Sequence, residues 1–242
     1  MIDQYLKNIH TLLDRVLQTQ SDAMDRAAAA VADTLQQGGM VYAFGTGHSH
    51  MLAEELFYRA GGLVKVFPIL DDALMLHTNA SRSSHLERLP GYAATLLDNG
   101  FSPTEADIVF IFSNSGRNAV PVELAQEMKQ RGVRTVCITN LAQSAAAVSR
   151  HTSGLRLFEI CDIVIDNCGA VGDAAMQIGQ NRCGPTSTVI GAAILQAIVC
   201  SVVAKLERRG IAPEVFCSSN VDGGDECNER LIRQYRAQIP ML

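Results

Sequence analysis

The sequence predicts an α/β protein built on a doubly wound, five-stranded parallel sheet. Short runs of β-type residues recur along the chain, and Ile108-Val109-Phe110-Ile111-Phe112 is typical of a strand covered on both faces. Segments with apolar residues at helical spacing separate these runs, and helices between strands imply parallel crossovers. Gly- or Ser-rich turns complete the repeating pattern. We predict strands at residues 40–44, 64–67, 107–112, 134–139 and 162–166.

The chain opens with a helical segment. Residues 3–37 carry apolar side chains at helical spacing, among them Ile9, Val16 and Val31, and the pattern stops at Gly38-Gly39. This spacing predicts a helix or a pair of helices with an apolar stripe. Because an apolar stripe that one domain leaves uncovered usually marks an interface, we expect a homodimer or a homotetramer.

Two stretches depart from the alternating pattern. Residues 70–104 gather polar side chains, including His77 and His85, and predict a long irregular connection. Such a connection is either a functional loop, for example a lid, or a mobile one. Residues 189–209 predict a long buried helix, and residues 227–238 a shorter one. No repeat or linker divides the chain. We expect one domain, 1–242, made of an N-terminal helical segment (1–37), a sheet core (38–210) and a C-terminal helical extension (211–242).

The composition excludes several classes of partner. Aromatic residues make up 5% of the chain and Trp is absent, which argues against broad stacking platforms for single-stranded nucleic acid. The net charge of −5 argues against a protein that coats a duplex or an anionic membrane. A small anion remains compatible, because loop amides bind phosphate even inside an acidic protein.

The cysteines and the N-terminus indicate the compartment. Seven scattered cysteines without a C-x-x-C motif indicate buried, reduced thiols in a reducing compartment and not a disulfide framework. The first residues lack the basic and apolar segments of a signal peptide, and the most apolar run, 189–204, is shorter than a typical membrane span. We expect a cytoplasmic protein.

The first candidate ligand loop is Gly45-Thr46-Gly47-His48-Ser49, between a predicted strand and a predicted helix. Its glycines allow a ligand to approach the backbone, and a helix N-terminus offers free amides to an anion. A tight turn without a ligand is the alternative. Neither nucleotide motif fits: His50 replaces the third glycine of G-x-G-x-x-G, and the Gly-Lys-Ser/Thr of Walker A is missing.

The second and third loops are Ser113-Asn114-Ser115-Gly116-Arg117-Asn118 and Gly184-Pro185-Thr186-Ser187-Thr188. The second loop follows a buried strand, so its hydroxyl and amide groups form a donor-rich cup where α/β sheets bind ligands. A helix N-cap with an Asx-turn is the alternative, since it favours the same residue types. The third loop precedes the long helix, where Thr186 or Ser187 would serve as N-cap with or without a ligand.

Together these loops resemble the SIS (sugar isomerase) domain family over roughly residues 35–225. Arabinose 5-phosphate isomerases are similar at all three loops and from 205–210 to 219–224, and sedoheptulose 7-phosphate isomerases are similar at Ala53-Glu54-Glu55-Leu56. The resemblance implies a flavodoxin-like fold and a phosphosugar ligand. It also implies phosphate held by Ser113, Asn114, Ser115 and Asn118, and sugar hydroxyls near Thr46, Ser49 and Ser187.

The chain departs from these relatives at their catalytic positions. His48 stands where arabinose 5-phosphate isomerases carry a Lys, Arg117 and Val120 replace their acidic residues, and Asn220 replaces a His. Arg59 stands where the heptose isomerases place a Glu. The resemblance therefore retains the phosphate site and leaves the reaction open.

Aldose–ketose isomerisation through an enediol needs a base and an acid. The resemblance to heptose isomerases implies Glu55 as the base, and His48 is placed to act as acid, base or hydrogen-bond donor. A solvated helix Glu and a surface His are the alternatives. His77 and His85 are candidates to enter a neighbouring subunit's site, with plain exposure as their alternative.

Other candidates concern metal and the third loop. His48 and His50 with His77 or Glu55 would suit zinc by residue type, but their spacing gives no metal signature, so we predict no metal cofactor. Asp173 and Gln177, just before the third loop, are further candidate site residues.

These features predict a phosphosugar isomerase. A non-catalytic phosphosugar sensor is the alternative, as is a lyase that removes a lactyl ether from an amino-sugar phosphate, although Arg59 occupies its base position. A DNA-binding regulator does not fit, because only about 40 residues precede the first predicted strand and no basic helix-turn-helix is present. The partner is therefore a small-molecule sugar phosphate, with no nucleic acid and no membrane.

Overall fold

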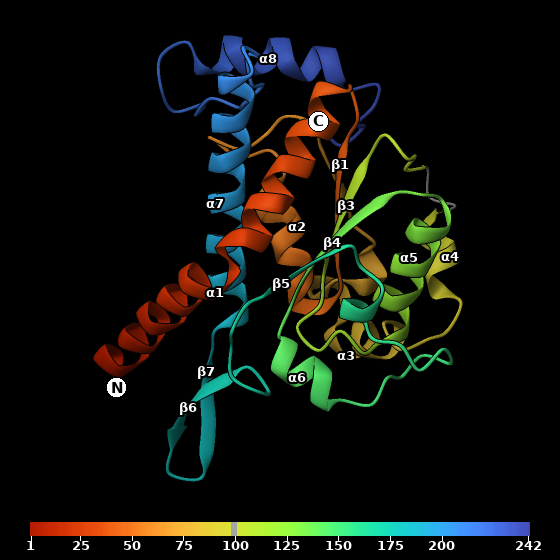
Figure 1. Cartoon of the computed structure of the whole chain (residues 1–242), viewed down its shortest axis with the longest axis vertical. Helices are drawn as coiled ribbons and strands as arrows, with labels where there is room; N and C mark the ends of the chain where they lie inside the picture. Colours follow the sequence, from red (N-terminus) through yellow and green to blue (C-terminus); the bar gives the residue numbers. More distant parts are fainter. Residues whose placement is uncertain (98–100) are drawn as a thin grey trace.

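A computed structural model describes residues 1–97 and 101–242 and confirms the predicted parallel sheet (Figure 1). All neighbouring strands of the sheet pair in parallel, in the order β2-β1-β3-β4-β5. The chain passes from β1 outward to β2, and from β3 outward through β4 to β5, so the order reverses between β1 and β3. At such a point a crevice opens beyond the carboxyl ends of the strands. The strands are β1 (Val41–Gly45), β2 (Val66–Ile69), β3 (Ile108–Phe112), β4 (Arg134–Thr139) and β5 (Ile163–Asp166).

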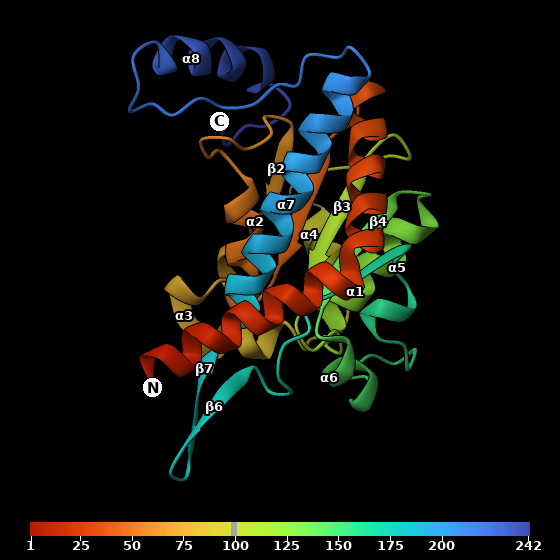
Figure 2. The ribbon, with the colours of Figure 1, turned by 60° about the vertical axis from the view of Figure 1, so that its left-hand side comes forward.

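Helices cover both faces of the sheet (Figure 2). Alternate residues of a strand point to opposite faces. Phe110 therefore joins the apolar cluster beneath one helical layer, and Ile111 joins the cluster beneath the other. The first layer holds α1 (Ile2–Gln36), α2 (His50–Leu56) and α7 (Ser187–Arg208), and the second holds α4 (Tyr92–Leu97) and α5 (Ala119–Gln130).

The remaining elements lie at the two ends of the sheet. Figure 1 shows α8 at the amino end, and α6 with the β6–β7 hairpin at the carboxyl end. These elements are α3 (Leu76–Leu86), α6 (Leu141–Ala146), β6 (Ala174–Ile178), β7 (Asn181–Pro185), α8 (Gly224–Tyr235) and the short 3-10 helices η1 (Gly47–Ser49), η2 (Asp72–Leu74) and η3 (Leu157–Glu159).

The expectation of an irregular connection over residues 70–104 was wrong for most of its length. This segment forms η2, α3 and α4, and its residues 98–100 lie outside the described part of the chain. Asp71 starts η2 by accepting hydrogen bonds from the amides of Ala73 and Leu74. Leu74 and Leu96 are buried in the core. The burial of these few apolar side chains therefore orders the segment, although its polar composition does not indicate helices.

The β6–β7 hairpin has no counterpart in the sequence prediction. Apart from Met176 and Ile178 its residues are small or polar, and all of them are half-buried or exposed, so the two strands lack the sustained apolar alternation that predicts a strand. Gly179, with φ of +58°, opens the two-residue turn between the strands. The prediction of one or two N-terminal helices resolves to the single helix α1.

Candidate functional site

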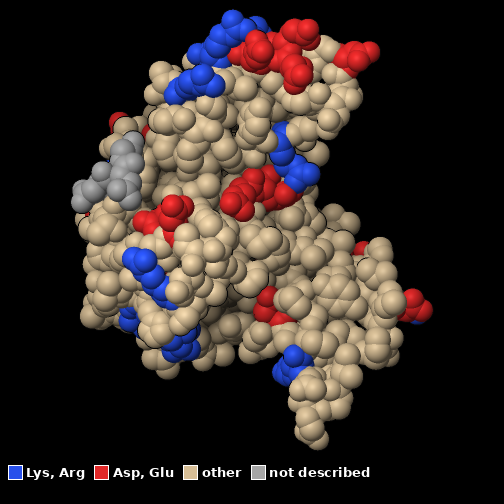
Figure 3. Space-filling view, turned by 180° about the vertical axis from the view of Figure 1, so that it is seen from behind, with Lys and Arg blue, Asp and Glu red and all other residues tan. Residues whose placement is uncertain are grey.

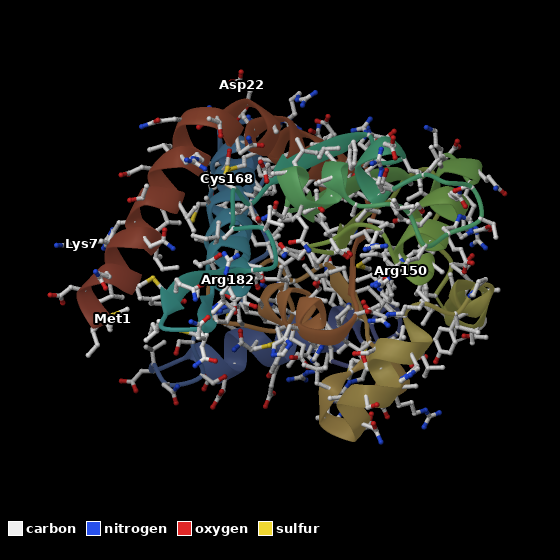
Figure 4. All side chains as sticks on the ribbon, turned by 90° about the horizontal axis from the view of Figure 1, so that it is seen from below. Met1, Lys7, Asp22, Arg150, Cys168 and Arg182 are labelled. Carbon is white, nitrogen blue, oxygen red and sulfur yellow. The ribbon has the colours of Figure 1, made fainter. Side chains whose placement is uncertain are left out.

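A cavity of about 320 Å³ lies beyond the carboxyl ends of β1 and β3. This is the position where the strand order reverses, and the volume falls in the usual range for small-molecule sites. Figure 4 shows this edge of the sheet from below, with Arg182 of β7 and Arg150 on either side of its centre. The lining residues are Thr46, Gly47, His48, Ser49, Leu76, Ser83, Ser84, Glu87, Ser113, Asn114, Ser115, Asn118, Gln143, Gly172 and Asp173.

The first loop, residues 45–49, forms one wall. A Cβ on Gly45 would lie 2.4 Å from the Ser49 carbonyl oxygen, so only glycine lets the chain turn from β1 directly into η1. Thr46 is buried and donates a hydrogen bond of 2.8 Å from its hydroxyl to Glu87 Oε2. Within residues 1–97 and 101–242, the exposed ring of His48 makes no hydrogen bond or ion pair, so it is free to meet a ligand.

The second loop, residues 113–118, forms the opposite wall. Gly116 has φ of +58°, and the buried Ser113 hydroxyl accepts a hydrogen bond of 3.2 Å from the Gly116 amide, which closes the turn. The Asn118 side chain does not cap α5; its Oδ1 instead accepts a hydrogen bond of 2.9 Å from Arg150 Nη1. In the described part of the chain, the Ser115 hydroxyl has no protein partner. The loop thus presents donors that the fold does not consume.

Positive charge surrounds the second loop. The Arg150 amide donates to the Arg117 carbonyl oxygen at 2.8 Å, which ties the two arginines together. Burial, followed by the nearby guanidinium groups of Arg117 and Arg88, lowers the pKa of Arg150, and the Glu87 carboxylate opposes this effect. Three arginines therefore lie near one another beside the loop, where they favour an anion.

The side chain of Asn114 connects this loop to the rest of the carboxyl edge. Its Oδ1 accepts a hydrogen bond of 2.8 Å from Asn167, and its amide donates to Gln143 at 3.4 Å. Gln143 in turn accepts from the Gly172 amide at 2.9 Å. This network fixes the loop against α6 and the segment before the hairpin.

The third loop, residues 184–188, is held by Asp173. One carboxylate oxygen of Asp173 accepts hydrogen bonds from the amides of Thr186 and Ser187, at 2.9 and 2.8 Å, and the other accepts from the Ser187 hydroxyl at 2.5 Å. Thr186, one of the two predicted N-cap residues, occupies the N-cap position of α7, but its side chain makes no capping hydrogen bond. The Asp173 carboxylate takes over that role by accepting from the free amides. Ser187 and Thr188 line a smaller hollow that adjoins the main cavity and shares Ser49, Ser113 and Asn114 with it.

The structure brings most of the predicted site residues together. Gly45, Gly116 and Thr186 shape the loops without lining the cavity. Nine predicted residues line the main cavity, namely Thr46, Gly47, His48, Ser49, Ser113, Asn114, Ser115, Asn118 and Asp173.

Glu55 lies outside this group. It sits near the end of α2, where its carboxylate pairs with Arg59 and accepts a hydrogen bond of 3.0 Å from Gln196 of α7. Its proposed role as a base stays a prediction, and no part of the cavity wall includes it.

The other histidines are engaged elsewhere. His50 is buried and contacts the Gly47 carbonyl oxygen through its ring, and its ring centroid is 6.5 Å from that of the exposed His77. His85 contacts the Ser81 carbonyl oxygen at 2.8 Å, and Gln177 donates to the Gly179 carbonyl within the hairpin turn. Among the described residues, no group of three or more His, Cys, Asp or Glu side chains could hold a metal ion.

Sequence reasoning missed Glu87 and Gln143, and Ser83 and Ser84 of α3. Glu87 follows α3, and its carboxylate reaches Thr46 only through the tertiary fold. The high content of polar residues in 70–104 was the sequence signal that this segment lines the cavity.

The chain is similar to known proteins both in sequence and in fold. The SIS domain family matches residues 4–140. A UPF0309 protein of Geobacillus thermodenitrificans (strain NG80-2) is 46% identical over 244 residues, covering 100% of this chain and 98% of that protein.

Two solved structures share the fold at low identity. A phosphoheptose isomerase from Francisella tularensis aligns with a TM-score of 0.55 and 15% identity, over 84% of this chain and 96% of that one. The Vibrio vulnificus NanR protein complexed with ManNAc-6P aligns with a TM-score of 0.51 and 16% identity, over 100% of this chain and 69% of that one. The full-length match and the family match, which covers the first two loops, agree with the resemblance read from the motifs. The chain therefore belongs to the SIS domain family, within its UPF0309 group.

Proposed function

We propose that the cavity binds a sugar phosphate, with the phosphate on the second loop. The observation that carries this proposal is the Ser115 hydroxyl, which lines the cavity without a protein partner in the described residues. Ser113 and Asn114 stand beside it at the N-terminal approach to α5, whose partial positive charge favours an anion. Arg150 adds positive charge through Asn118. A phosphosugar bound in the NanR structure of the same fold supports the choice of ligand.

We further propose that the chain isomerises this ligand between its aldose and ketose forms. Glu87 lines the same cavity as the phosphate loop, so its carboxylate is placed to take the proton from one sugar carbon and return it to the neighbouring carbon. The proton lost by C2 is the proton gained by C1, and the intermediate between them is an enediol. His48, which has no protein partner among residues 1–97 and 101–242, is placed to move protons between the two sugar oxygens.

A phosphosugar sensor without catalysis is the second candidate. The observation that favours it concerns Glu55, the base implied by the resemblance. Its carboxylate pairs with Arg59 and accepts a hydrogen bond from Gln196, away from the cavity. The lyase alternative lacks such support, since Arg59, which stands at its base position, is paired with Glu55.

We also propose a homodimer. Ile2 and Leu6 of α1 remain exposed, at 79% and 52%, and Tyr5 between them contacts Pro185 of the hairpin. Ile178 at the hairpin tip is 45% exposed. These apolar side chains are on elements that project beyond the body of the molecule (Figure 1).

Two measurements test the proposed function. Thermal melts with pentose, hexose, heptose and N-acetylamino sugar phosphates, each beside its unphosphorylated sugar, should show a rise of about 5–10 °C for one phosphate at a hundredfold excess over its Kd. Proton NMR of that ligand should then show its conversion between the aldose and ketose forms if the chain is an isomerase. Stabilisation without conversion identifies a sensor, and no stabilisation by any phosphate contradicts both readings.

A further inference from the structure

Two cysteines lie close together near α8, at the amino end of the sheet and opposite the cavity. Cys217 is exposed in the segment that leads to α8, and Cys227 is half-buried in the first turns of that helix. Their sulfur atoms are 3.2 Å apart. The end of the molecule that carries α8 is at the top of Figure 3, and Lys/Arg and Asp/Glu side chains gather there.

The backbone holds Cys217 in this position. The Cys217 amide donates to Asn228 Oδ1 at 2.9 Å, and the Asn228 side-chain amide donates to the Cys217 carbonyl oxygen at 2.9 Å. Asn228 is buried and directly follows Cys227, so it clamps both peptide groups of Cys217 to the helix turn that carries the second thiol. A Cβ on Gly224 would lie 2.1 Å from the Ser218 carbonyl oxygen, so glycine is required for this close approach.

We propose that Cys217 and Cys227 form a disulfide under a peroxide oxidant and thereby fasten α8 to the segment before it. A disulfide has an S–S distance of about 2.0 Å, so the two sulfurs need to close about 1 Å. The thiolate of Cys217 attacks hydrogen peroxide; an S–O bond forms, the O–O bond breaks, and one water leaves. The thiolate of Cys227 then attacks the sulfenic sulfur, forming the S–S bond and releasing the second water. One peroxide takes up the two electrons from the two thiols.

The other thiols differ in access or in partner. Cys137 and Cys168 are buried, and the half-buried Cys161 has the buried Cys137 thiol as its neighbour. Cys183 and Cys200 are exposed, and in the described part of the chain neither has a second thiol within contact. The hydrogen bond that the Cys217 thiol donates to Cys227, together with desolvation and charge repulsion from Cys227, raises the pKa of Cys217, so its oxidation should accelerate as the pH rises above neutral.

Fastening this segment should stabilise α8. Phe216, beside Cys217, packs in one apolar cluster with Leu231 and Tyr235 of α8. A disulfide between residues 217 and 227 closes a short loop and so reduces the conformational entropy of the unfolded chain. This loss of entropy predicts a rise in Tm of about 5 °C or more.

Peptide mapping tests the bond directly. No Lys or Arg lies between Arg209 and Arg230, so a single tryptic peptide, residues 210–230, contains both cysteines. The folded, reduced chain is treated with a small excess of hydrogen peroxide, alkylated and digested. We expect this peptide to carry no alkyl group and to be two hydrogens lighter than the reduced, unalkylated peptide. Treatment with a reductant before alkylation should restore the doubly alkylated peptide. Oxidation in urea should give much less of this product.

Matched variants separate the pair from the general reactivity of thiols. Cys183→Ser removes one exposed thiol and should leave the cross-link and the rise in Tm unchanged, whereas Cys217→Ser and Cys227→Ser should each abolish both. A doubly alkylated peptide after oxidation of the folded chain would overturn the proposal, as would disulfide-linked dimers through Cys217. A cross-linked chain with an unchanged Tm would overturn the stabilising role. None of these readouts depends on the ligand or on activity.

Discussion

Glu87 and Glu55 have different surroundings, although both are partly buried acids. The Glu87 carboxylate faces the cavity and accepts one hydrogen bond from a neutral hydroxyl, that of Thr46. The Glu55 carboxylate is held by a guanidinium and an amide. Only Glu87 lines the cavity, so the two residues should differ sharply in their effect on rate.

We predict that Glu87→Gln lowers kcat by about a hundredfold or more while ligand affinity stays within about threefold, because general-base catalysis typically contributes that much. The amide oxygen still accepts the Thr46 hydrogen bond, which preserves the loop. Glu55→Gln is the matched comparison and should retain turnover. Steady-state rates and calorimetric titration of both variants decide the matter; loss of turnover in Glu55→Gln alone would restore Glu55 as the base.

At the phosphate loop, Ser115→Ala should weaken every phosphosugar ligand by about ten- to a hundredfold, the usual contribution of a hydrogen bond to a charged group. The fold should be unaffected, since the hydroxyl has no protein partner among the described residues. Ser81→Ala, an exposed serine of α3 outside the cavity wall, serves as control. If Ser115→Ala lowers the Tm of the unliganded chain and leaves affinity unchanged, the hydroxyl is structural and the phosphate binds elsewhere.

How far single residues can be predicted depends on how local their chemistry is. Gly116 and Ser113 were predictable because a turn after a buried strand selects those residue types within a few positions of each other. Glu87 was not, because its contact with Thr46 joins positions 41 residues apart. Its role exists only once α3 has packed beside the first loop.

Among the elements, η3 and α6 share an arginine that supports the second loop from behind. Arg156 donates to both carboxylate oxygens of Glu159 and to the carbonyl oxygens of Ala145 and Ala147 at the end of α6. The Leu157 amide donates to the Gly116 carbonyl oxygen at 2.8 Å, so this junction bears directly on the loop. The hydrogen bonds from Arg156 lower the pKa of Glu159 to about 2.

This gives a stability prediction with a defined sign. Because the folded-state pKa of Glu159 lies below its ordinary value of 4.5, its contribution is complete above that value and is lost as the pH falls toward 2. Glu159→Gln should therefore lower the free energy of unfolding at pH 7, by at most about 1 kcal/mol for so accessible a pair. Urea melts at several pH values should show the difference between mutant and parent shrinking below pH 4.5. A difference that is constant with pH would exclude the ion pair as its cause.

The strands were predictable for a related reason. β3 is buried on both faces, so all of its residues are apolar and the sequence states its environment directly. The β6–β7 hairpin and α3 are half-exposed, and their polar residues satisfy a turn or loop pattern equally well. Their form is decided by what they pack against, which one sequence does not display.

For the whole molecule we predict a dimer in solution. The sequence-based reason needs revision, because Ile9, Leu12 and Val16 of the α1 stripe are buried within the chain itself. Leu6 remains exposed and is therefore available to a second subunit. Leu6→Glu should shift the mass measured by light scattering at micromolar concentration toward the monomer. Val148→Glu changes a residue that is 79% exposed beyond α6 and should leave the mass unchanged. A parent chain of monomeric mass would contradict the dimer outright.

The packing of α1 against α7 has a consequence for synthesis. α1 ends at Gln36, and α7, which covers its apolar face, begins at Ser187. A ribosome adding about 5–20 residues per second leaves that face without its partner for on the order of 10 s. Nascent chains should therefore depend on holding factors until α7 emerges. A fragment ending at residue 140, where the family match stops, should fail to fold alone despite containing two of the three ligand loops.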